Sequence, residues 1–253
     1  MNDNYAKYPS LKGKTVFVTG GASGIGEEIV KAFAAQGSRV GFLDLDAKSA
    51  EALVASTKGD ISYEICDLRD IDALKGAFAK LQEKLGPASV LVNNAARDDR
   101  HNWREVTPDY WDERMATNLR HMFFSIQAVA PGMIDAGNGG SIINMGSNSW
   151  WQASGGMPAY TTAKSAVHGL TRTMARDLGD YRIRVNCVVP GWVMTQRQKD
   201  LWVTEEAIEE HRARQCLPDL VQPVHLARMV LFLASDDAQM CTANNYMVEA
   251  GSI

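Results

Sequence analysis

A tyrosine and a lysine four residues apart, with a serine shortly before them, are the residues of this chain best suited to chemistry. Tyr160 and Lys164 would lie about one turn apart on the same face of a helix. An ammonium near a phenol favours the phenolate, so this tyrosine could accept a proton from a substrate hydroxyl. Ser147 follows the apolar segment 141–145, where a strand would end and direct its hydroxyl toward the same site. The alternative is that the Tyr–Lys spacing has no catalytic meaning, as in many helices.

A glycine-rich turn near the N-terminus is the second candidate site. Residues 14–19 are short and rich in β-formers, which predicts a buried strand. The strand leads into Gly20-Gly-Ala-Ser-Gly-Ile-Gly26, and a helical pattern follows as far as Gly37. Glycines let the backbone approach a ligand closely, and a helix N-terminus favours negative charge. We therefore predict that the turn binds the diphosphate of a nucleotide, the alternative being a tight turn without a ligand.

An acidic residue at the end of the next expected strand bears on the choice of nucleotide. Asp44 ends the segment 39–44. A carboxylate at this position can hydrogen-bond both ribose hydroxyls of an adenosine, and it repels a 2′-phosphate. No lysine or arginine follows Asp44 before Lys48, which we expect on the next helix. The sequence thus favours NAD over NADP, unless Asp44 only caps that helix.

The elements that must position these residues alternate between strands and helices. Further strands are predicted at 61–66, 90–95, 141–145, 184–191 and 246–251, and further helices at 47–57, 70–84, 107–136, 157–178 and 224–234. This rhythm predicts an α/β fold, a single Rossmann-type doubly wound parallel sheet of about seven strands with helices on both faces. Ligands of such sheets bind beyond the carboxyl ends of the strands. Since we find no repeat or linker, we expect residues 1–253 to form a single domain.

Two polar residues of this pattern leave their roles open. Asp67 follows the third expected strand and could reach the edge of an adenine or cap the following helix. Asn118 falls on an otherwise apolar helical stripe with Trp111, Met115 and Met122. A buried amide needs partners, so a structural hydrogen bond is the simpler role for Asn118 and a catalytic water relay is the alternative.

Three segments are expected to border the bound ligands. Residues 96–103 are unusually polar and directly follow a strand of the sheet. Residues 148–156 follow the serine of the candidate catalytic group. Residues at about 191–222 have no clean sheet pattern, which predicts a mobile substrate lid with an amphipathic helix, or else a surface excursion.

Composition argues against several classes of function. A net charge of −4, without any Lys/Arg-rich run, argues against a nucleic-acid surface. The four cysteines are scattered, so we expect no metal site and free thiols in a reducing compartment. The polar residues 1–9 contain no apolar core of a signal peptide, and no apolar run reaches the roughly 18 residues of a membrane helix. These features predict a cytoplasmic protein without a membrane partner.

Over essentially its whole length the chain resembles the short-chain dehydrogenase/reductase family. The matching motifs are Thr19-Gly20-x-x-x-Gly24-x-Gly26, Asn93-Asn94-Ala95, Asn118, Ser147, Tyr160-x-x-x-Lys164 and Pro190-Gly191. One departure is Ala96, where the family commonly has glycine and where a methyl could narrow the nicotinamide pocket. Within the family, residues 8–13, 98–101, 111–114, 118–122 and 187–191 are similar to those of NAD-dependent sugar (aldose) 1-dehydrogenases of the xylose dehydrogenase type.

The resemblance implies a role for each member of a catalytic tetrad. Tyr160 would be the general base, and Ser147 would hydrogen-bond the substrate oxygen. Lys164 would lower the pKa of the tyrosine and hold the nicotinamide ribose, and Asn118 would position a water. The implied cofactor-binding residues are Gly20, Ser23, Gly24, Ile25, Gly26, Asp44, Leu45, Asp67, Leu68, Asn94, Ala95, Tyr160, Lys164, Pro190, Val193 and Thr195. The family also implies a homotetramer, or at least a dimer, through the helices near 108–136 and 157–178.

The leading hypothesis for function is NAD-dependent oxidation of C1 of an aldose to the lactone. The expected rim of the pocket suits a sugar, because it offers hydrogen-bonding groups (Asn148, Gln152 and His101) and indole rings that can stack on a pyranose (Trp150, Trp151 and Trp192). The predicted substrate-binding residues are Arg97, His101, Ser147, Asn148, Trp151, Tyr160, Trp192 and Arg197.

Two other hypotheses remain open. Arg97, Arg100 and Arg197 could clamp an anionic substrate, such as a sulfonated sugar, a sugar acid or a deoxy keto-sugar acid, unless they pair with Asp98 and Asp99. A catalytically silent nucleotide-binding scaffold would be expected to lose members of the tetrad. This chain keeps all four, which disfavours that hypothesis.

Overall fold

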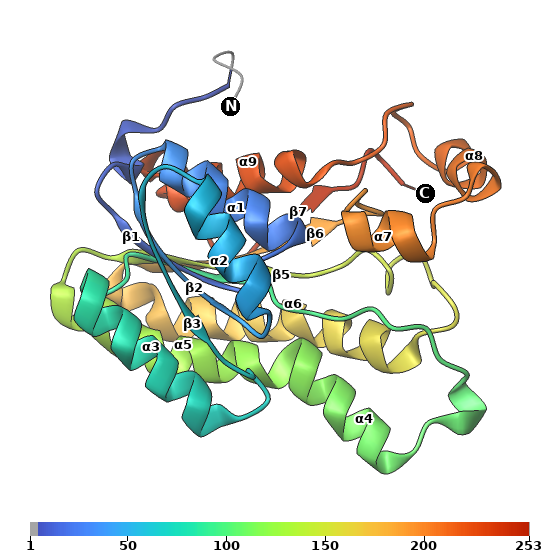
Figure 1. Cartoon of the computed structure of the whole chain (residues 1–253), viewed down its shortest axis with the longest axis horizontal. Helices are drawn as coiled ribbons and strands as arrows, with labels where there is room; N and C mark the ends of the chain where they lie inside the picture. Colours follow the sequence, from blue (N-terminus) through green and yellow to red (C-terminus); the bar gives the residue numbers. More distant parts are fainter. Residues whose placement is uncertain (1–4, 253) are drawn as a thin grey trace.

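The computed structural model describes residues 5–252 and is built around a parallel sheet of seven strands (Figure 1). Their order is β3-β2-β1-β4-β5-β6-β7, and each neighbouring pair is parallel. The strands are β1 Thr15–Thr19, β2 Arg39–Asp44, β3 Asp60–Ile65, β4 Val90–Asn93, β5 Gly140–Met145, β6 Ile183–Pro190 and β7 Asn245–Val248. The predicted fold class is confirmed. Residues 1–4 of the polar N-terminal segment, and the last residue of the predicted single domain, lie outside the described range.

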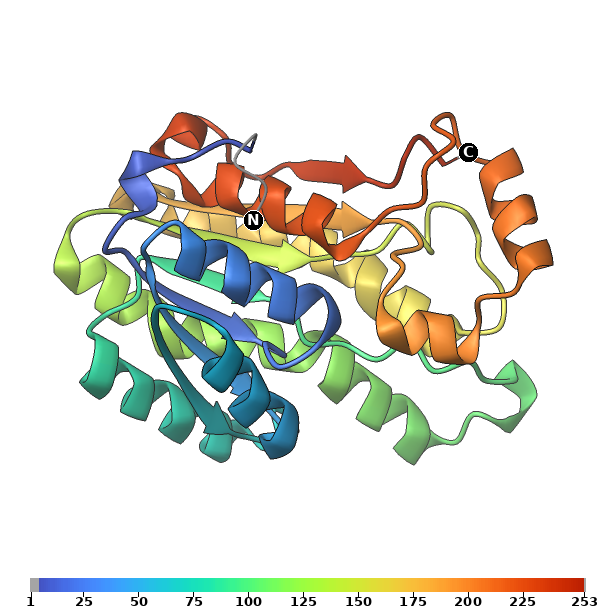
Figure 2. The same ribbon diagram turned by 45° about the horizontal axis from the view of Figure 1, so that its top comes forward.

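Helices cover both faces of the sheet (Figures 1 and 2). One face carries α1 Gly24–Ala35, α2 Ala47–Ser56 and α9 Pro223–Ala234, and the other carries α3 Ile71–Leu85, α5 His121–Ala136 and α6 Pro158–Leu178. Side chains of a strand alternate between faces, so Val16 and Val18 of β1 enter one core and Phe17 enters the other. A sheet buried on both sides therefore needs the continuous apolar strands that the sequence shows.

The direction in which the chain winds reverses between β1 and β4. From β1 the chain proceeds outward through β2 to β3, and from β4 it proceeds the other way to β7. The helices that follow β1 and β4 consequently diverge, which leaves a crevice at the carboxyl ends of these central strands. This crevice is where the glycine-rich turn after β1 and the residues after β4 meet.

The helix expected at 107–136 is interrupted by a π-helical turn. It consists of α4 Pro108–Met115, the π turn Ala116–Arg120 and α5, which Pro131 does not end. A π turn changes the angular phase of the residues on either side of it. As a result Trp111 is exposed whereas Asn118 and Met122 are buried, so the prediction that these side chains share one face is wrong for Trp111.

The segment 191–222 contains two short helices, α7 Gln196–Leu201 and α8 Glu205–Ala213, beyond the carboxyl ends of β5 and β6 (Figure 2). A threonine caps each of them. The hydroxyl of Thr195 accepts from the N–H of Gln198, and that of Thr204 accepts from the N–H of Ala207. A cap of this kind stabilises a helix by about 1 kcal/mol. The sequence predicts only one amphipathic helix in this segment.

Residues 5–252 hold neither a membrane-spanning helix nor a cluster of metal ligands. None of the helices in this range is long and apolar enough to cross a membrane. Nor do His, Cys, Asp and Glu side chains of this range gather into a group of three that could hold a metal ion.

Candidate active site

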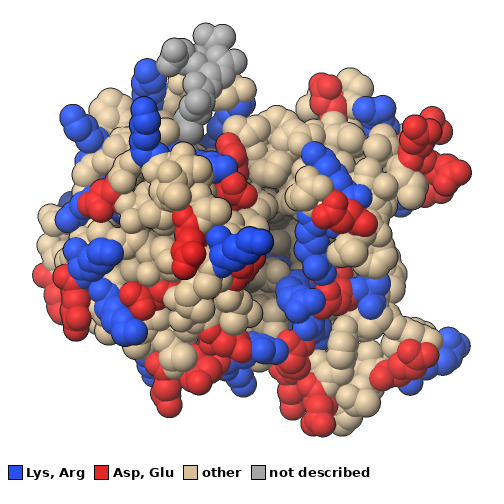
Figure 3. All heavy atoms as spheres, viewed as in Figure 1, with Lys and Arg blue, Asp and Glu red and all other residues tan. Residues whose placement is uncertain are grey.

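A cavity of about 860 Å³ lies at the carboxyl ends of the strands, beside the point where the winding reverses. Figure 3 shows this side of the molecule hollowed, with basic and acidic side chains interspersed along the rim. All predicted cofactor-binding residues line the cavity except Gly26. Ser147, Tyr160 and Lys164 line it as well, so the fold brings the glycine-rich turn and three members of the predicted tetrad to one cavity.

The glycine-rich turn has no room for a side chain at two of its positions. Gly20 has φ +66°, and a Cβ there would lie 2.8 Å from the Cα of Ala95. A Cβ on Gly26 would lie 1.8 Å from the carbonyl oxygen of Gly20, so both positions require glycine. Asn94 fixes the turn against β4 by donating from Nδ2 to the Gly20 carbonyl at 2.9 Å. Ser23, the N-cap residue of α1, makes no side-chain capping bond, which leaves the first turn of this helix to a ligand.

Asp44 lines the cavity at the end of β2. Its Oδ2 accepts from the N–H of Ala22 at 2.8 Å, and its Oδ1 accepts from the N–H of Asp46 at 3.1 Å. The alternative that Asp44 caps α2 is wrong, because Asp46 is the N-cap residue and accepts from the N–H of Ser49. Each Asp44 oxygen keeps accepting capacity for a further donor such as a ribose hydroxyl.

Asp67 lines the same cavity, and Arg69 holds its carboxylate. Arg69 Nη2 donates to Asp67 Oδ2 at 2.6 Å, and this hydrogen bond lowers the pKa of Asp67. Arg69 Nη1 also reaches Glu113 Oε1 on α4, at 3.0 Å. Asp70, and not Asp67, caps α3, so the capping alternative for Asp67 is wrong.

Tyr160 and Lys164 occupy successive turns of α6, as their spacing predicts. Lys164 is 1% exposed, and its Nζ donates to the carbonyl of Met145, the last residue of β5, at 2.7 Å. The same Nζ lies 5.9 Å from the centre of the Tyr160 ring. Burial lowers the pKa of Lys164 to about 8. A single hydrogen bond thus ties the lysine to the strand that precedes Ser147.

The pKa of Tyr160 is raised to about 12, which contradicts the expectation of a lowered value. Burial is the main cause, and the negative charge of Asp98 adds to it. A hydrogen bond with Ser147 and the charge of Arg100 act in the opposite direction without reversing the shift. The spacing of Tyr160 and Lys164 was visible in the sequence, whereas the desolvation that dominates the phenol was not.

Asn118 is fully buried in the π turn and does not line the cavity. Its Oδ1 accepts from the N–H of Arg97 at 2.8 Å, and its Nδ2 donates to the carbonyl of Arg114 at 3.0 Å. Both ends of the amide are thus bonded to backbone. This geometry favours the structural role over the water relay, since Asn118 anchors the segment 96–103 to the helix.

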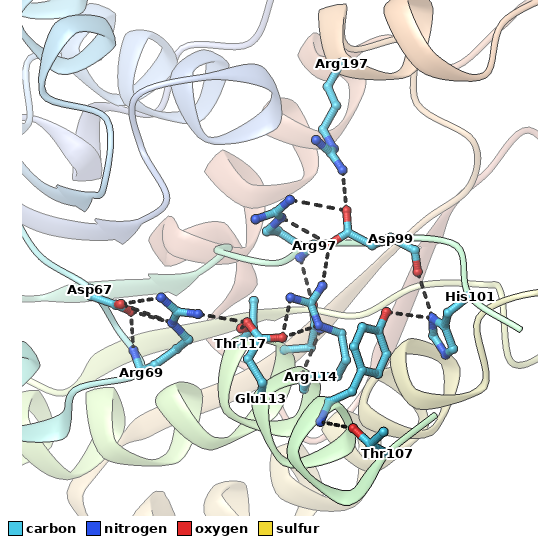
Figure 4. A network of polar contacts seen from close by, with 12 residues as sticks. Asp67, Arg69, Arg97, Asp99, His101, Thr107, Glu113, Arg114, Thr117 and Arg197 are labelled. Carbon is cyan, nitrogen blue, oxygen red and sulfur yellow. Dashed lines mark hydrogen bonds and ion pairs between the residues drawn. The ribbon is translucent and has the colours of Figure 1, made fainter. Parts of the chain in front are cut away.

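Asp99 is the centre of an ion-pair network in the segment 96–103 (Figure 4). Its carboxylate lies 3.3 Å from Nε of Arg97, 2.6 Å from Nη2 of Arg197 and 2.5 Å from Nη1 of the buried Arg114. These guanidinium groups lower the pKa of Asp99 although burial opposes the shift. Because Arg197 belongs to α7, the network ties the predicted lid to the loop after β4.

Two of the eight predicted substrate-binding residues, His101 and Trp151, do not line the cavity, so the structure does not support that role for either of them. The ring nitrogens of His101 are engaged by protein groups, and the Trp151 side chain is 68% exposed. Asn148 does line the cavity. It is 6% exposed, and its Nδ2 has no hydrogen-bond partner among the described residues, so it can donate to a ligand.

Sequence reasoning missed several lid residues that line the cavity, namely Gln196, Gln198, Trp202, Ala207, Glu210, His211 and Arg214. His211 is 9% exposed, and its ring meets that of Trp192 edge-on with 5.2 Å between centroids. Its Nε2 is buried and has no partner in the part of the chain that the structure describes. Apolar residues of α8 such as Ala207 and Ile208 indicate an inward side, but this pattern does not single out the polar side chains, such as His211, that line the cavity.

A buried histidine on α5 should make the stability of the protein depend on pH. His121 is fully buried beside the carbonyl of Ala95, and burial lowers its pKa to about 3. The unfolded chain binds a proton at this histidine near pH 6.5, but the folded chain does not until about pH 3. The free energy of unfolding therefore falls on acidification through this window, by at most about 1.4 kcal/mol per pH unit.

Urea unfolding at pH 6.5 and pH 5 of the native protein and of His121→Gln measures this effect. We expect the native protein to lose roughly 2 kcal/mol more than the variant over this interval, since glutamine binds no proton. Equal losses in the two proteins would show that His121 is not the source.

The chain is similar in sequence to known proteins over nearly its whole length. Residues 20–252 match the family model described as enoyl-(acyl carrier protein) reductase. The chain is 49% identical over 249 residues to D-xylose 1-dehydrogenase of Caulobacter vibrioides (97% of this chain and 98% of that protein). It is 45% identical over 250 residues to the probable galactose dehydrogenase GalD of Rhizobium meliloti (97% of each).

A solved structure has the same fold as this chain. A variant of actinorhodin polyketide ketoreductase, determined with NADPH, superimposes with a TM-score of 0.87 at 30% identity, over 94% of this chain and 96% of that chain. That complex contains a nicotinamide dinucleotide.

Proposed function

The chain belongs to the short-chain dehydrogenase/reductase family, and on this premise we propose that it oxidises C1 of an aldose to the lactone with NAD. The observation that carries the proposal is the single cavity that joins the glycine-rich turn to Ser147, Tyr160 and the unpartnered amide of Asn148. A substrate held there would have its hydroxyl beside a phenol and further hydroxyls beside a free N–H donor.

We propose the following division of roles. NAD, when bound, would supply the hydride acceptor. Tyr160 accepts the hydroxyl proton at Oη, and Ser147 donates from Oγ to the substrate oxygen as carbonyl character develops. Lys164, which is held by the Met145 carbonyl 5.9 Å from the centre of the Tyr160 ring, would hold the nicotinamide ribose and keep positive charge near the phenol. For Asn118 we propose an anchoring role, because its amide is bonded at both ends.

The choice of NAD over NADP rests on Asp44. Its carboxylate lines the cavity, and the exposed Leu45 and Asp46 that follow it bring no positive charge to the end of β2. A negative charge at this place favours two ribose hydroxyls and disfavours a phosphate.

A neutral aldose is favoured over an anionic sugar as the substrate. Both named sugar dehydrogenases that resemble the chain carry neutral sugars in their names. Two of the three arginines that could clamp an anion are engaged, since Arg97 and Arg197 pair with Asp99 and Arg197 also lies 3.7 Å from Asp98. The third is Arg100, whose guanidinium carbon Cζ lies 5.4 Å from the centre of the Trp202 ring.

The remaining features of the proposal concern organisation. We propose one domain, with residues at about 191–222 as a substrate lid tied to Asp98 and Asp99. We also propose a cytoplasmic location, which the four free thiols support, and a homotetramer or at least a dimer. Exposed apolar side chains on α4 and α5, such as Trp111 and Phe123, support association through these helices.

The proposal is tested by NADH formation at 340 nm, with NAD and a panel of D-xylose, D-galactose, D-glucose and their sugar-acid and sulfonated analogues. We expect turnover with a neutral aldose and a lactone as product. Activity confined to an anionic member would transfer the proposal to anionic sugars, and Arg97→Ala should then raise KM for that substrate. Absence of turnover on the whole panel, with NADH still bound, would contradict a sugar substrate.

A further inference from the structure

The first turn of α6, the helix that carries Tyr160, has no cap from its own segment. Its N-cap residue Met157 makes no side-chain capping hydrogen bond. Pro158 follows at the first helical position and has no N–H to be satisfied. The first N–H of the helix therefore belongs to Ala159, the residue immediately before Tyr160.

A histidine from the loop after β4 satisfies this N–H. Nε2 of His101 lies 3.2 Å from the backbone nitrogen of Ala159 and accepts a hydrogen bond from its N–H. The N–H of His101 donates to the carbonyl of Gly156 at 2.7 Å, so backbone and ring of one residue both hold the start of α6. We propose that His101 is a positioning residue, which caps α6 across 58 residues of chain and thereby fixes Tyr160 in the active site.

The surroundings of the ring select the tautomer that can act as a cap. A backbone N–H can only donate, so Nε2 must be unprotonated and Nδ1 must carry the proton. Nδ1 lies 3.0 Å from the carbonyl oxygen of Asp99 (Figure 4). It also lies 3.0 Å from the phenol oxygen of Tyr110, and both oxygens can accept from it. The Tyr110 ring also packs edge-on against the imidazole, with 5.0 Å between centroids.

Asp99 connects His101 to the rest of the site. Asp99, whose carbonyl faces Nδ1, binds buried Arg114 of α4 and Arg197 of α7 through its carboxylate. The loop that meets the lid is thus the loop that caps the catalytic helix. A displacement of this loop would move the start of α6 and with it Tyr160, and small misplacements of reacting groups cost about 100-fold in rate.

Three substitutions separate capping from general packing. His101→Gln places an amide oxygen near the position of Nε2 and can still accept the Ala159 N–H. The asparagine of His101→Asn reaches only as far as the position of Nδ1, so it cannot accept the Ala159 N–H. His101→Ala removes the hydrogen bonds of both ring nitrogens. We expect Ala and Asn to lower kcat for D-xylose roughly 10- to 100-fold, with the Kd of NADH within about twofold of the native value, whereas Gln stays within about threefold.

A second readout needs no substrate and keeps the inference separate from the proposed function on which it rests. Amide hydrogen exchange at Ala159 and Tyr160 should be about fivefold faster in the Ala and Asn variants and close to native in the Gln variant. Faster exchange with unchanged kcat would overturn the positioning role, and unchanged exchange would overturn the cap itself. If the native protein oxidises none of the sugars, the proposed function fails, and exchange alone decides whether His101 caps α6.

Discussion

Tyr160→Phe should lower kcat by roughly a factor of 1,000 or more while NADH still binds. The substitution deletes only the phenol oxygen, the atom that we propose accepts the substrate proton, and a general base contributes about 10²- to 10⁴-fold. The ring remains beside Lys164, whose Nζ lies 5.9 Å from its centre and stays bonded to Met145. Rates follow from NADH formation at 340 nm, and binding follows from NADH fluorescence. Turnover above about a tenth of the native rate would exclude Tyr160 as the base.

The pH dependence of the native enzyme supplies a second test of the same base. Because burial raises the pKa of Tyr160 to about 12, the deprotonated form is scarce near neutrality. The value of kcat/KM should therefore rise with pH, by up to about tenfold per unit while the tyrosine remains mostly protonated. The residual activity of Tyr160→Phe should lack this rise. A flat native profile between pH 6 and 7.5, where Lys164 with its pKa of about 8 stays mostly charged, would mean that another group accepts the proton.

The sheet and the residues proposed to bind the cofactor could be predicted from local patterns in the sequence. The central strands β1, β2, β4, β5 and β6 are largely apolar and end at or just before a polar or glycine residue, and parallel connections bring these ends to one edge. Gly20, Asp44 and Ser147 each lie at or just after a strand end, so their meeting could be predicted without knowing any distance. Gly20 and Gly26 of the turn could be recognised as a motif, and a side chain fits at neither position.

The substrate side depended on contacts between segments far apart in the chain. His101 looks like a sugar ligand in the sequence because it follows a strand, yet its ring binds Ala159, 58 residues away. The inward face of α8, which carries Ala207, Ile208 and His211, is only weakly marked in the sequence, because most residues of this helix are charged. The pKa of Tyr160 depends on desolvation, which spacing alone cannot reveal. The exposure of Trp111 could not be predicted either. It depends on the π turn before α5, and no residue type marks such a turn in the sequence.

Replacing Asp44 should relax the choice of cofactor. The paired change Asp44→Ser with Leu45→Arg removes the carboxylate and places a guanidinium at a position that is 62% exposed and lines the cavity. Losing hydrogen bonds to a charged acceptor costs roughly 10- to 100-fold, so kcat/KM for NAD should fall by about that factor. Activity with NADP should rise, since repulsion of the 2′-phosphate is replaced by attraction.

Asp46→Asn is the matched control for this change, because it removes a carboxylate two residues away that does not line the cavity. Asparagine can still accept the N–H of Ser49, so the cap of α2 is kept and the ratio of kcat/KM values for NAD and NADP should stay within about twofold of the native ratio. If Asp46→Asn shifted the ratio as much as the paired change, general charge near the helix would govern the choice of cofactor. A native enzyme that used both cofactors equally would contradict the role of Asp44 altogether. A shift confined to the paired change would mean that the charge carried by residues 44 and 45, at the end of β2, selects between NAD and NADP.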